Sequence, residues 1–231
     1  MKANTVAVIS DGSAVLGLGN IGAYAALPVM EGKAVLFKEF GQVNAVPICL
    51  NTQDTEEIIK TIVNIAPAFG GINLEDISAP RCFEIEERLK ELLDIPVFHD
   101  DQHGTAIVVL AGIINALKVT GKQKDSCKVV VNGAGSAGIA ITKLLLTYGF
   151  SHITMCDING ILSKKFAEFK LHAKNYMTEV TNLEEKKEHL PMLSVAQIFS
   201  IGVSAPNIVT EDMVASMNKD AILFRHGKSC P

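Results

Sequence analysis

The strongest chemical pattern in the sequence is a glycine-rich turn. Residues 129–138 form a strand-like run that leads into G-x-G-x-x-G and then into a helix-like run, 139–148. Glycines permit a tight turn and close backbone approach, and a helix N-terminus offers free N–H groups to a pyrophosphate. A second strand-like run ends in Asp157, where an acid can bind ribose hydroxyls. The alternative is an ordinary turn with chance glycines, but in this context the motif predicts a dinucleotide site made by Gly133, Ala134, Gly135, Ser136, Ala137, Gly138 and Asp157.

A second glycine set has the same spacing. Gly17, Gly19 and Gly22 also read G-x-G-x-x-G, but no acid ends a following strand at the right distance. We interpret this set as a turn and close-packing site and not as a second dinucleotide fold.

Two acidic pairs follow strand-like runs. Glu75-Asp76 closes the run 71–76, and Asp100-Asp101 closes the run 95–100. The helix-like stretch between them makes a βαβ unit, so both pairs should meet at the carboxyl edge of a parallel sheet. Four carboxylates there repel one another unless a cation joins them, and hard oxygen ligands favour Mg²⁺ or Mn²⁺. Helix N-capping by Asp76 and Asp101 explains the same residues equally well.

Two histidines flank the second acidic pair. The spacing of His99 and His103 suits a metal, but His99 should end a strand and His103 should lie across a turn. We therefore interpret both as hydrogen-bonding partners.

Lys33 occupies an unusual place in the expected helix 22–40. Burial of its ammonium lowers the lysine pKa and makes a neutral amine available as a base. The other interpretation, which the residues alone favour, is a lysine at the core edge whose ammonium reaches water. In either case Lys33 falls within an apolar stripe made by Ala26, Val29, Met30, Leu36, Phe37 and Phe40.

The elements expected around these residues alternate between strand and helix. This alternation predicts the α/β class with parallel sheets. The tract 174–193 is polar and charged and has no clear assignment. Strands are expected at 5–9, 44–50, 71–76, 95–100, 128–132, 152–157, 197–203 and 221–224, and helices near 22–38, 54–66, 79–93, 104–119, 136–149, 162–173 and 210–217.

Composition excludes several classes of protein. In 231 residues, 48% are hydrophobic and 20% charged, which excludes long disordered regions. A formal net charge of −4 without a basic run argues against nucleic acid as a partner. The apolar runs, such as 107–114, are far shorter than a membrane span, and the N-terminus lacks a signal-peptide layout, so a cytoplasmic protein without a membrane partner is expected. Five scattered cysteines without C-x-x-C argue against a disulfide framework or a zinc site.

Several longer motifs, in this order along the chain, resemble the malic enzyme family. The similarity is to its compact, bacterial-type form, which is NAD(P)-dependent and decarboxylating. The motifs lie at residues 6–12, 16–22, 27–33, 70–77, 98–106 and 201–206.

The resemblance implies two domains. Residues 1–103 would form the malate- and metal-binding catalytic domain, and residues 104–231 a Rossmann-like NAD(P)-binding domain. It also implies that the metal lies in the cleft between the two domains, and that the full-length protein is a homodimer or higher homo-oligomer.

The resemblance further implies roles for individual residues. The reaction would be oxidative decarboxylation of malate to pyruvate and CO₂ with NAD or NADP. Glu75, Asp76 and Asp101 match ligands of Mg²⁺ or Mn²⁺, Lys33 matches the lysine that takes the C2 hydroxyl proton, and Asp100 matches an acid beside that lysine. The alternatives are a catalytically inactive nucleotide-binding fragment and a malolactic-type relative.

Two parts of the family pattern are not matched. The tyrosine that protonates enolpyruvate belongs to a segment upstream of Met1, and Tyr24, Tyr148 and Tyr176 do not match it. After Phe224 an Asn-Pro segment is replaced by the atypical tail 225–231. The sequence therefore resembles a malic enzyme truncated at both ends.

Overall fold

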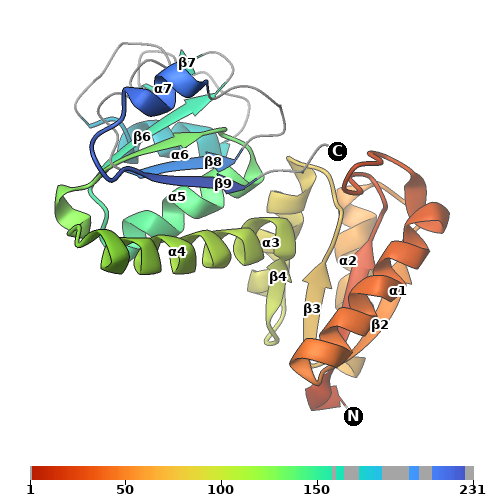
Figure 1. The fold of residues 1–231 in the computed structure, drawn as a ribbon. Helices are drawn as coiled ribbons and strands as arrows, with labels where there is room; N and C mark the ends of the chain where they lie inside the picture. The colour runs from red at the N-terminus through yellow and green to blue at the C-terminus, as the bar shows by residue number, and fades with distance from the viewer. Residues whose placement is uncertain (1, 158–159, 164–171, 184–197, 203–209, 227–231) are drawn as a thin grey trace. The chain divides into compact units, whose positions relative to one another are not determined.

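The computed structural model describes residues 2–157, 160–163, 172–183, 198–202 and 210–226. It divides the chain into two units, Met1–Asp101 and Gln102–Pro231, each with its own sheet (Figure 1). The boundary expected from the sequence, between residues 103 and 104, falls close to this division.

The first unit contains a parallel sheet of four strands. These are β1 (Thr5–Ser10), β2 (Asn44–Cys49), β3 (Gly71–Leu74) and β4 (Val97–His99), in the spatial order β2-β1-β3-β4. Pro47 lies in β2, an edge strand, where a missing N–H is tolerated. Parallel pairing aligns the carboxyl ends of all four strands at one edge.

Helices cover both faces of this sheet. The helices α2 (Thr55–Ile65) and α3 (Arg81–Leu92) pack against the face that carries Ala7 and Ile9. The α1 helix (Gly22–Gly41) covers the opposite face, where Phe37 meets Phe98. Short 3₁₀ turns, Lys2–Asn4 and Ala66–Ala68, precede β1 and β3. The α2 N-terminus is fixed by the Asp54 carboxylate, which accepts a hydrogen bond from the Glu57 N–H at 2.9 Å.

The expected apolar stripe of α1 is only partly correct. Ala26 and Met30 are buried, but Val29, Leu36 and Phe40 are 40%, 53% and 82% exposed. The reason is that α1 is broadly apolar around its circumference, and only the side facing β1 and β2 is covered within the unit.

The second unit contains a mostly parallel sheet. Its order is β7-β6-β5-β8-β9, and only the β6–β7 pair is antiparallel. The short β7 was not expected from the sequence, because two residues carry no readable alternation. The strands are β5 (Lys128–Asn132), β6 (His152–Asp157), β7 (Gly160–Ile161), β8 (Ile198–Gly202) and β9 (Ile222–His226).

Four described helices accompany this sheet, and a 3₁₀ turn at Lys124–Ser126 lies between the first of them and β5. They are α4 (Asp100–Thr120), α5 (Ser136–Tyr148), α6 (His172–Val180) and α7 (Glu211–Ala215). Ala106, Val109, Ile113 and Leu117 of α4 join the buried core formed with β5 and α5. Among the described helices, α4 alone is long and apolar enough to cross a membrane, a test that core helices of soluble proteins also pass.

Two expected elements differ from the structure. The strand 95–100 ends at His99 and the helix expected at 104 begins at Asp100, because acidic residues in a first turn stabilise the helix N-terminus. The unassigned tract from 174 contains most of α6, whose end at Val180 is followed by the described residues 181–183. Most of the helix expected at 162–173 lies outside the described residues.

Candidate active site

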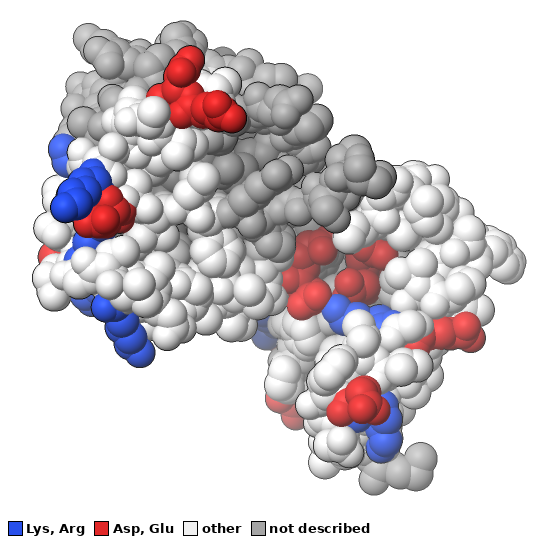
Figure 2. All heavy atoms as spheres, in the orientation of Figure 1, with Lys and Arg blue, Asp and Glu red and all other residues white. Residues whose placement is uncertain are grey.

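The acidic pairs lie at the carboxyl edge of the first sheet. The strands β3 and β4 are parallel neighbours, with Leu74 opposite His99, so Glu75 and Asp100 follow at equivalent positions. The expected βαβ arrangement is therefore confirmed. Figure 2 shows acidic side chains gathered beside a basic one on this unit.

Lys33 of α1 lies between the two acidic pairs. Its Nζ donates a hydrogen bond to Asp100 Oδ2 at 2.7 Å and is 3.1 Å from Glu75 Oε2. The Lys33 side chain is 20% exposed and Glu75 is 12% exposed, so the cluster is shielded without being sealed from water. The ammonium is also 6.0 Å from the centre of the Phe37 ring. The contact expected between Asp100 and Lys33 is present.

The pKa of Lys33 is raised, which corrects the expectation of a lowered one. Burial by itself lowers this pKa, but the hydrogen bonds to Asp100 and Glu75 and the negative charges of both carboxylates together outweigh the burial. Lys33 is therefore an ammonium group in this state. It also does not reach bulk water as a free lysine does, because both carboxylates hold it.

Asn73 orients Glu75 from inside the sheet. Its Nδ2 donates to Glu75 Oε2 at 2.8 Å, the same oxygen that faces Lys33. Asn73 is completely buried on β3 and faces the α1 side, whereas Ile72 and Leu74 face α2 and α3. Since Oε2 is occupied by two donors, the other carboxylate oxygen is the one available to a ligand.

Neither Asp76 nor Asp101 is a helix cap. The α3 helix begins at Arg81, with Pro80 before it, and Asp101 lies inside the first turn of α4. Asp76 is 5% exposed and has φ +53°, a left-handed conformation that costs a non-glycine residue roughly 1–2 kcal/mol. Such a conformation persists only where surrounding contacts hold it, so the contacts around Asp76 must fix the conformation of this turn.

The donor chemistry of this edge suits a hard cation, but the ligands are not assembled. Glu75, Asp76 and Asp101 offer only carboxylate oxygens, which Mg²⁺ and Mn²⁺ prefer. Among the residues that the structure describes, no three His, Cys, Asp or Glu side chains lie close enough together to hold one ion. The metal ligands therefore stay a prediction.

His99 differs from the expectation. It is 1% exposed, and neither ring nitrogen has a hydrogen-bond partner among the described residues. His103 lies within α4 and not across a turn, because the helix begins earlier than expected.

The glycine loop of the second unit forms the expected strand–turn–helix. Asn132 ends β5, Gly133 has φ +120°, and α5 begins at Ser136. The Gly133 N–H donates to the Cys156 carbonyl at 2.9 Å, which joins the loop to the end of β6, where Asp157 lies. The loop and Asp157 therefore lie together at the carboxyl edge of this sheet.

Gly138 and Gly135 of this loop differ in what the lack of a side chain makes possible. A Cβ on Gly138 would lie 1.8 Å from the Gly133 carbonyl oxygen, so α5 packs against the loop only because Gly138 has no side chain. A Cβ on Gly135 would meet nothing within 4 Å. Open space at the N-terminus of α5 is what a pyrophosphate needs to reach the free N–H groups.

The second glycine set is a turn, as expected, but not a close-packing site. Gly17, Gly19 and Gly22 have positive φ, and a Cβ on any of them would meet nothing within 4 Å. The close approach occurs at Gly12, whose Cβ would lie 2.3 Å from the Gly22 carbonyl oxygen.

Sequence reasoning missed Asn73, Arg81 and Asp11. A polar residue between Ile72 and Leu74 in a buried strand was a usable signal for Asn73. Nothing in the sequence indicates that Arg81 pairs with Asp11, because 70 positions of sequence separate residues 11 and 81. The motif at 201–206 lies mostly outside the described residues.

The fold and these two edges define a class of protein. A glycine loop with an acid at the next strand is typical of dinucleotide-binding α/β domains, and here it follows a parallel-sheet unit with a lysine between carboxylates.

Comparison with known proteins places the chain within this class. Residues 1–90 match the malic enzyme N-terminal domain, and residues 102–222 match the malic enzyme NAD binding domain. The chain belongs to the malic enzyme family.

Individual relatives agree with this assignment. The chain is 56% identical to the NAD-dependent malic enzyme of Geobacillus stearothermophilus, over 100% of this chain and 48% of that protein. It is 56% identical to the bifunctional malic/malolactic enzyme of Bacillus subtilis, over 97% of this chain and 55% of that protein. The NAD-dependent malic enzyme structure from Thermotoga maritima superimposes with a TM-score of 0.95 at 49% identity, over 100% of this chain and 61% of that one. The chain thus spans about half the length of the Geobacillus stearothermophilus and Bacillus subtilis relatives.

Proposed function

We propose that the protein carrying this chain oxidises malate with NAD⁺ or NADP⁺ and releases pyruvate and CO₂. The observation that carries the proposal is the Lys33 ammonium held 2.7 Å from Asp100 and 3.1 Å from Glu75, in a unit that matches the malic enzyme N-terminal domain. A proton carrier between carboxylates is what oxidation of a hydroxyl group needs. The expected homo-oligomeric state stays a prediction.

In this proposal the residues of the first unit move the proton. Lys33 first passes one ammonium proton to Asp100, and the neutral amine then takes the proton of the C2 hydroxyl of malate. Asn73 keeps Glu75 in place while this occurs. When bound, NAD(P)⁺ accepts the hydride and a divalent cation polarises the substrate oxygens. We assign the cation to Glu75, Asp76 and Asp101, which requires the exposed Asp101 side chain to turn toward the other two.

The residues of the second unit hold the cofactor in this proposal. Gly133, Ala134, Gly135, Ser136, Ala137 and Gly138 would receive the pyrophosphate at the N-terminus of α5, and Asp157 the ribose hydroxyls. The proposal is tested by mixing the protein with malate, Mn²⁺ and either cofactor and following the absorbance of the reduced nicotinamide. Absence of malate-dependent reduction with both cofactors would refute it.

A second candidate is a malolactic reaction. It is favoured by the Bacillus subtilis relative, whose name includes that activity. Lactate formed from malate without net cofactor reduction would identify this reaction. Lactate dehydrogenase with NAD⁺ would detect it in the same samples.

Asp101→Ala should weaken Mn²⁺ binding by about tenfold or more, since one of three proposed carboxylate ligands is lost. Calorimetric titration of the chain with Mn²⁺ measures this affinity. Asp94→Ala is the matched control, because Asp94 lies before β4 at the opposite end of the strand. Equal affinity in both variants would remove Asp101 from the ligand set.

NAD⁺ should be preferred over NADP⁺, because the Asp157 carboxylate repels a 2′-phosphate. Replacing it in Asp157→Ser should raise kcat/KM for NADP⁺ relative to NAD⁺ by about tenfold, or about 1.4 kcal/mol. Steady-state rates with both cofactors measure the ratio. A native preference for NADP⁺ would contradict the prediction. Lys164 and Lys165, which would favour that outcome, lie outside the described residues.

A further inference from the structure

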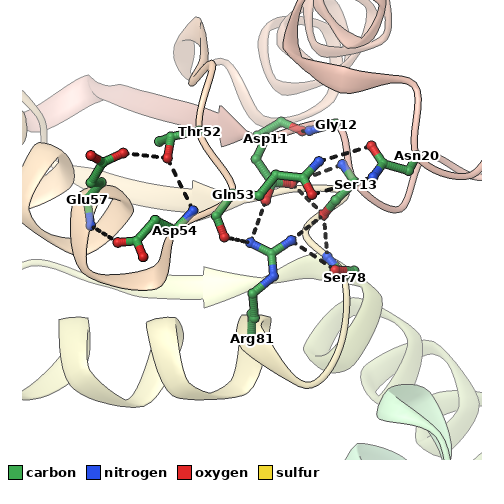
Figure 3. A network of polar contacts seen from close by, with 11 residues as sticks. Asp11, Gly12, Ser13, Asn20, Thr52, Gln53, Asp54, Glu57, Ser78 and Arg81 are labelled. Atoms are coloured by element: carbon green, nitrogen blue, oxygen red, sulfur yellow. Dashed lines mark hydrogen bonds and ion pairs between the residues drawn. The ribbon is translucent and has the colours of Figure 1, made fainter.

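A partly buried polar cluster lies beside the acidic edge of the first unit, centred on Arg81 (Figure 3). Arg81 is the first residue of α3, and its guanidinium contacts three loops. Its Nη1 is 2.9 Å from Asp11 Oδ2 and donates to the Gln53 carbonyl at 2.6 Å. Its Nη2 donates to Ser13 Oγ and Ser78 Oγ, each at 3.0 Å. These loops follow β1, β2 and β3, so one side chain joins three strand ends.

Asp11 is the buried carboxylate of this cluster. The carboxylate is completely buried, and its Oδ1 accepts hydrogen bonds from the N–H and the hydroxyl of Ser13 at 2.9 and 2.6 Å. A buried charge is stable only when it is paired and hydrogen-bonded. Oδ2 accepts no hydrogen bond within the described part of the chain, so the Arg81 guanidinium at 2.9 Å is its charge partner. The conformation of the loop after β1 therefore depends on Arg81.

That loop in turn holds the Asp76 turn from both sides. The Ala14 N–H donates to the Asp76 carbonyl at 2.9 Å, and the Ser78 N–H donates to Ser13 Oγ at 2.8 Å. Between these two bonds, Asp76 keeps its left-handed conformation with φ +53°. Arg81 contacts Ser13 and Ser78, the two residues joined by the second of these bonds, so it reaches the Asp76 backbone through them.

We infer that Arg81 is a positioning residue, which sets the Asp76 turn and thereby the affinity of the acidic edge for a divalent cation. The inference rests on the proposed function for the assignment of Asp76 as a ligand. Its prediction differs from that of simple electrostatics. Variants that keep the net charge of the unit should bind a cation as before by Coulomb attraction alone, whereas loss of the Arg81 contacts, here called the clamp, should weaken binding.

The test compares Arg81→Lys with Arg88→Lys in the 231-residue chain. Lysine keeps the charge at both positions, but a single ammonium lacks the planar fork that reaches three loops. Arg88 is the matched control, because it lies on the same helix and pairs with exposed Glu56 and Glu84. The double variant Asp11→Asn with Arg81→Met removes one charge of each sign, so it tests the clamp without leaving a buried carboxylate unpaired.

Two measurements decide the outcome. Hydrogen exchange without metal should rise about tenfold at the Ala14 and Ser78 amides in Arg81→Lys and in the double variant, while the Ile85 and Leu89 amides stay protected. Calorimetric titration with Mn²⁺ should show affinity lowered about tenfold in both, and unchanged in Arg88→Lys.

The inference is overturned if exchange at Ala14 and Ser78 in Arg81→Lys equals that in Arg88→Lys. It is also overturned if the Mn²⁺ affinity of Arg81→Lys equals or exceeds that of the unmodified chain. A uniform rise in exchange across the unit also overturns it, because that indicates a general structural role. An unmodified chain that binds no Mn²⁺ refutes the proposed metal site, and the inference with it. If the unmodified chain binds and Arg81→Lys binds equally well, the proposed site survives and only the inference fails.

Discussion

Lys33→Ala is expected to lower malate-dependent reduction of the cofactor about a thousandfold, within the range of general acid–base catalysis. The variant lacks the group that we propose as the proton carrier, and it leaves Glu75 and Asp100 without the ammonium between them. Binding of the reduced cofactor, followed by its fluorescence, should be unchanged, because Lys33 belongs to the first unit and the glycine loop to the second.

Two further variants separate proton transfer from charge. Lys33→Arg keeps a cation between the carboxylates, but a guanidinium stays protonated, so turnover should remain low. Lys38→Ala is the control on the same helix, where Lys38 is exposed and donates to Asn44 Oδ1 at 2.9 Å. Near-normal turnover of Lys33→Arg would show that Lys33 acts by its charge alone.

Gly138→Ala is expected to destabilise the second unit by about 3 kcal/mol, at the upper end of the usual cost of overpacking. The added methyl would lie 1.8 Å from the Gly133 carbonyl oxygen, and a backbone atom cannot move aside as a flexible side chain does. The α5 helix must then shift away from the loop, which should also disrupt the proposed pyrophosphate site. Denaturant unfolding and a fluorescence titration with reduced cofactor measure the two losses.

Gly135→Ala provides the contrast within the same loop. Its φ is −84°, which alanine adopts without strain, and the added methyl meets nothing within 4 Å. Stability should therefore change by less than about 0.5 kcal/mol. Cofactor affinity should still fall about tenfold or more, because the methyl occupies the approach to the α5 N-terminus. If both variants were equally stable, the packing role assigned to Gly138 would be wrong.

Much of the fold was predictable because its elements have strong local signals. The run Lys128–Asn132 is followed by glycines and a helix-forming stretch, and the expected strand and helix differ from β5 and α5 by at most one residue. The start of α4 was not predictable in this way. Asp100 and Asp101 could equally end a strand, cap a helix or occupy the first turn of a helix. Their place in the first turn of α4 is determined by tertiary contacts and not by the local sequence.

The candidate site also has some features that the sequence predicts and others that it does not. Two acidic pairs at the ends of consecutive strands could be placed at one edge by topology alone. The protonation of Lys33 could not be inferred, because it depends on two carboxylates, of which Asp100 is 67 positions away in the sequence. Periodicity also made Lys33 part of a buried stripe, although Leu36 and Phe40 of that stripe are exposed.

The central place of β1 in the first sheet has a consequence for synthesis on the ribosome. This strand leaves the ribosome before its neighbours on both sides, β2 and β3, which are complete only at Cys49 and Leu74. Ala7, Val8 and Ile9, which are fully buried in the finished sheet, cannot be paired on both sides until Leu74 has been synthesised. The nascent chain therefore carries an apolar strand with at least one unpaired edge while about 65 further residues are added. At 5–20 residues per second this takes roughly 3–13 s. This interval is when a chaperone that recognises apolar strands would be most useful.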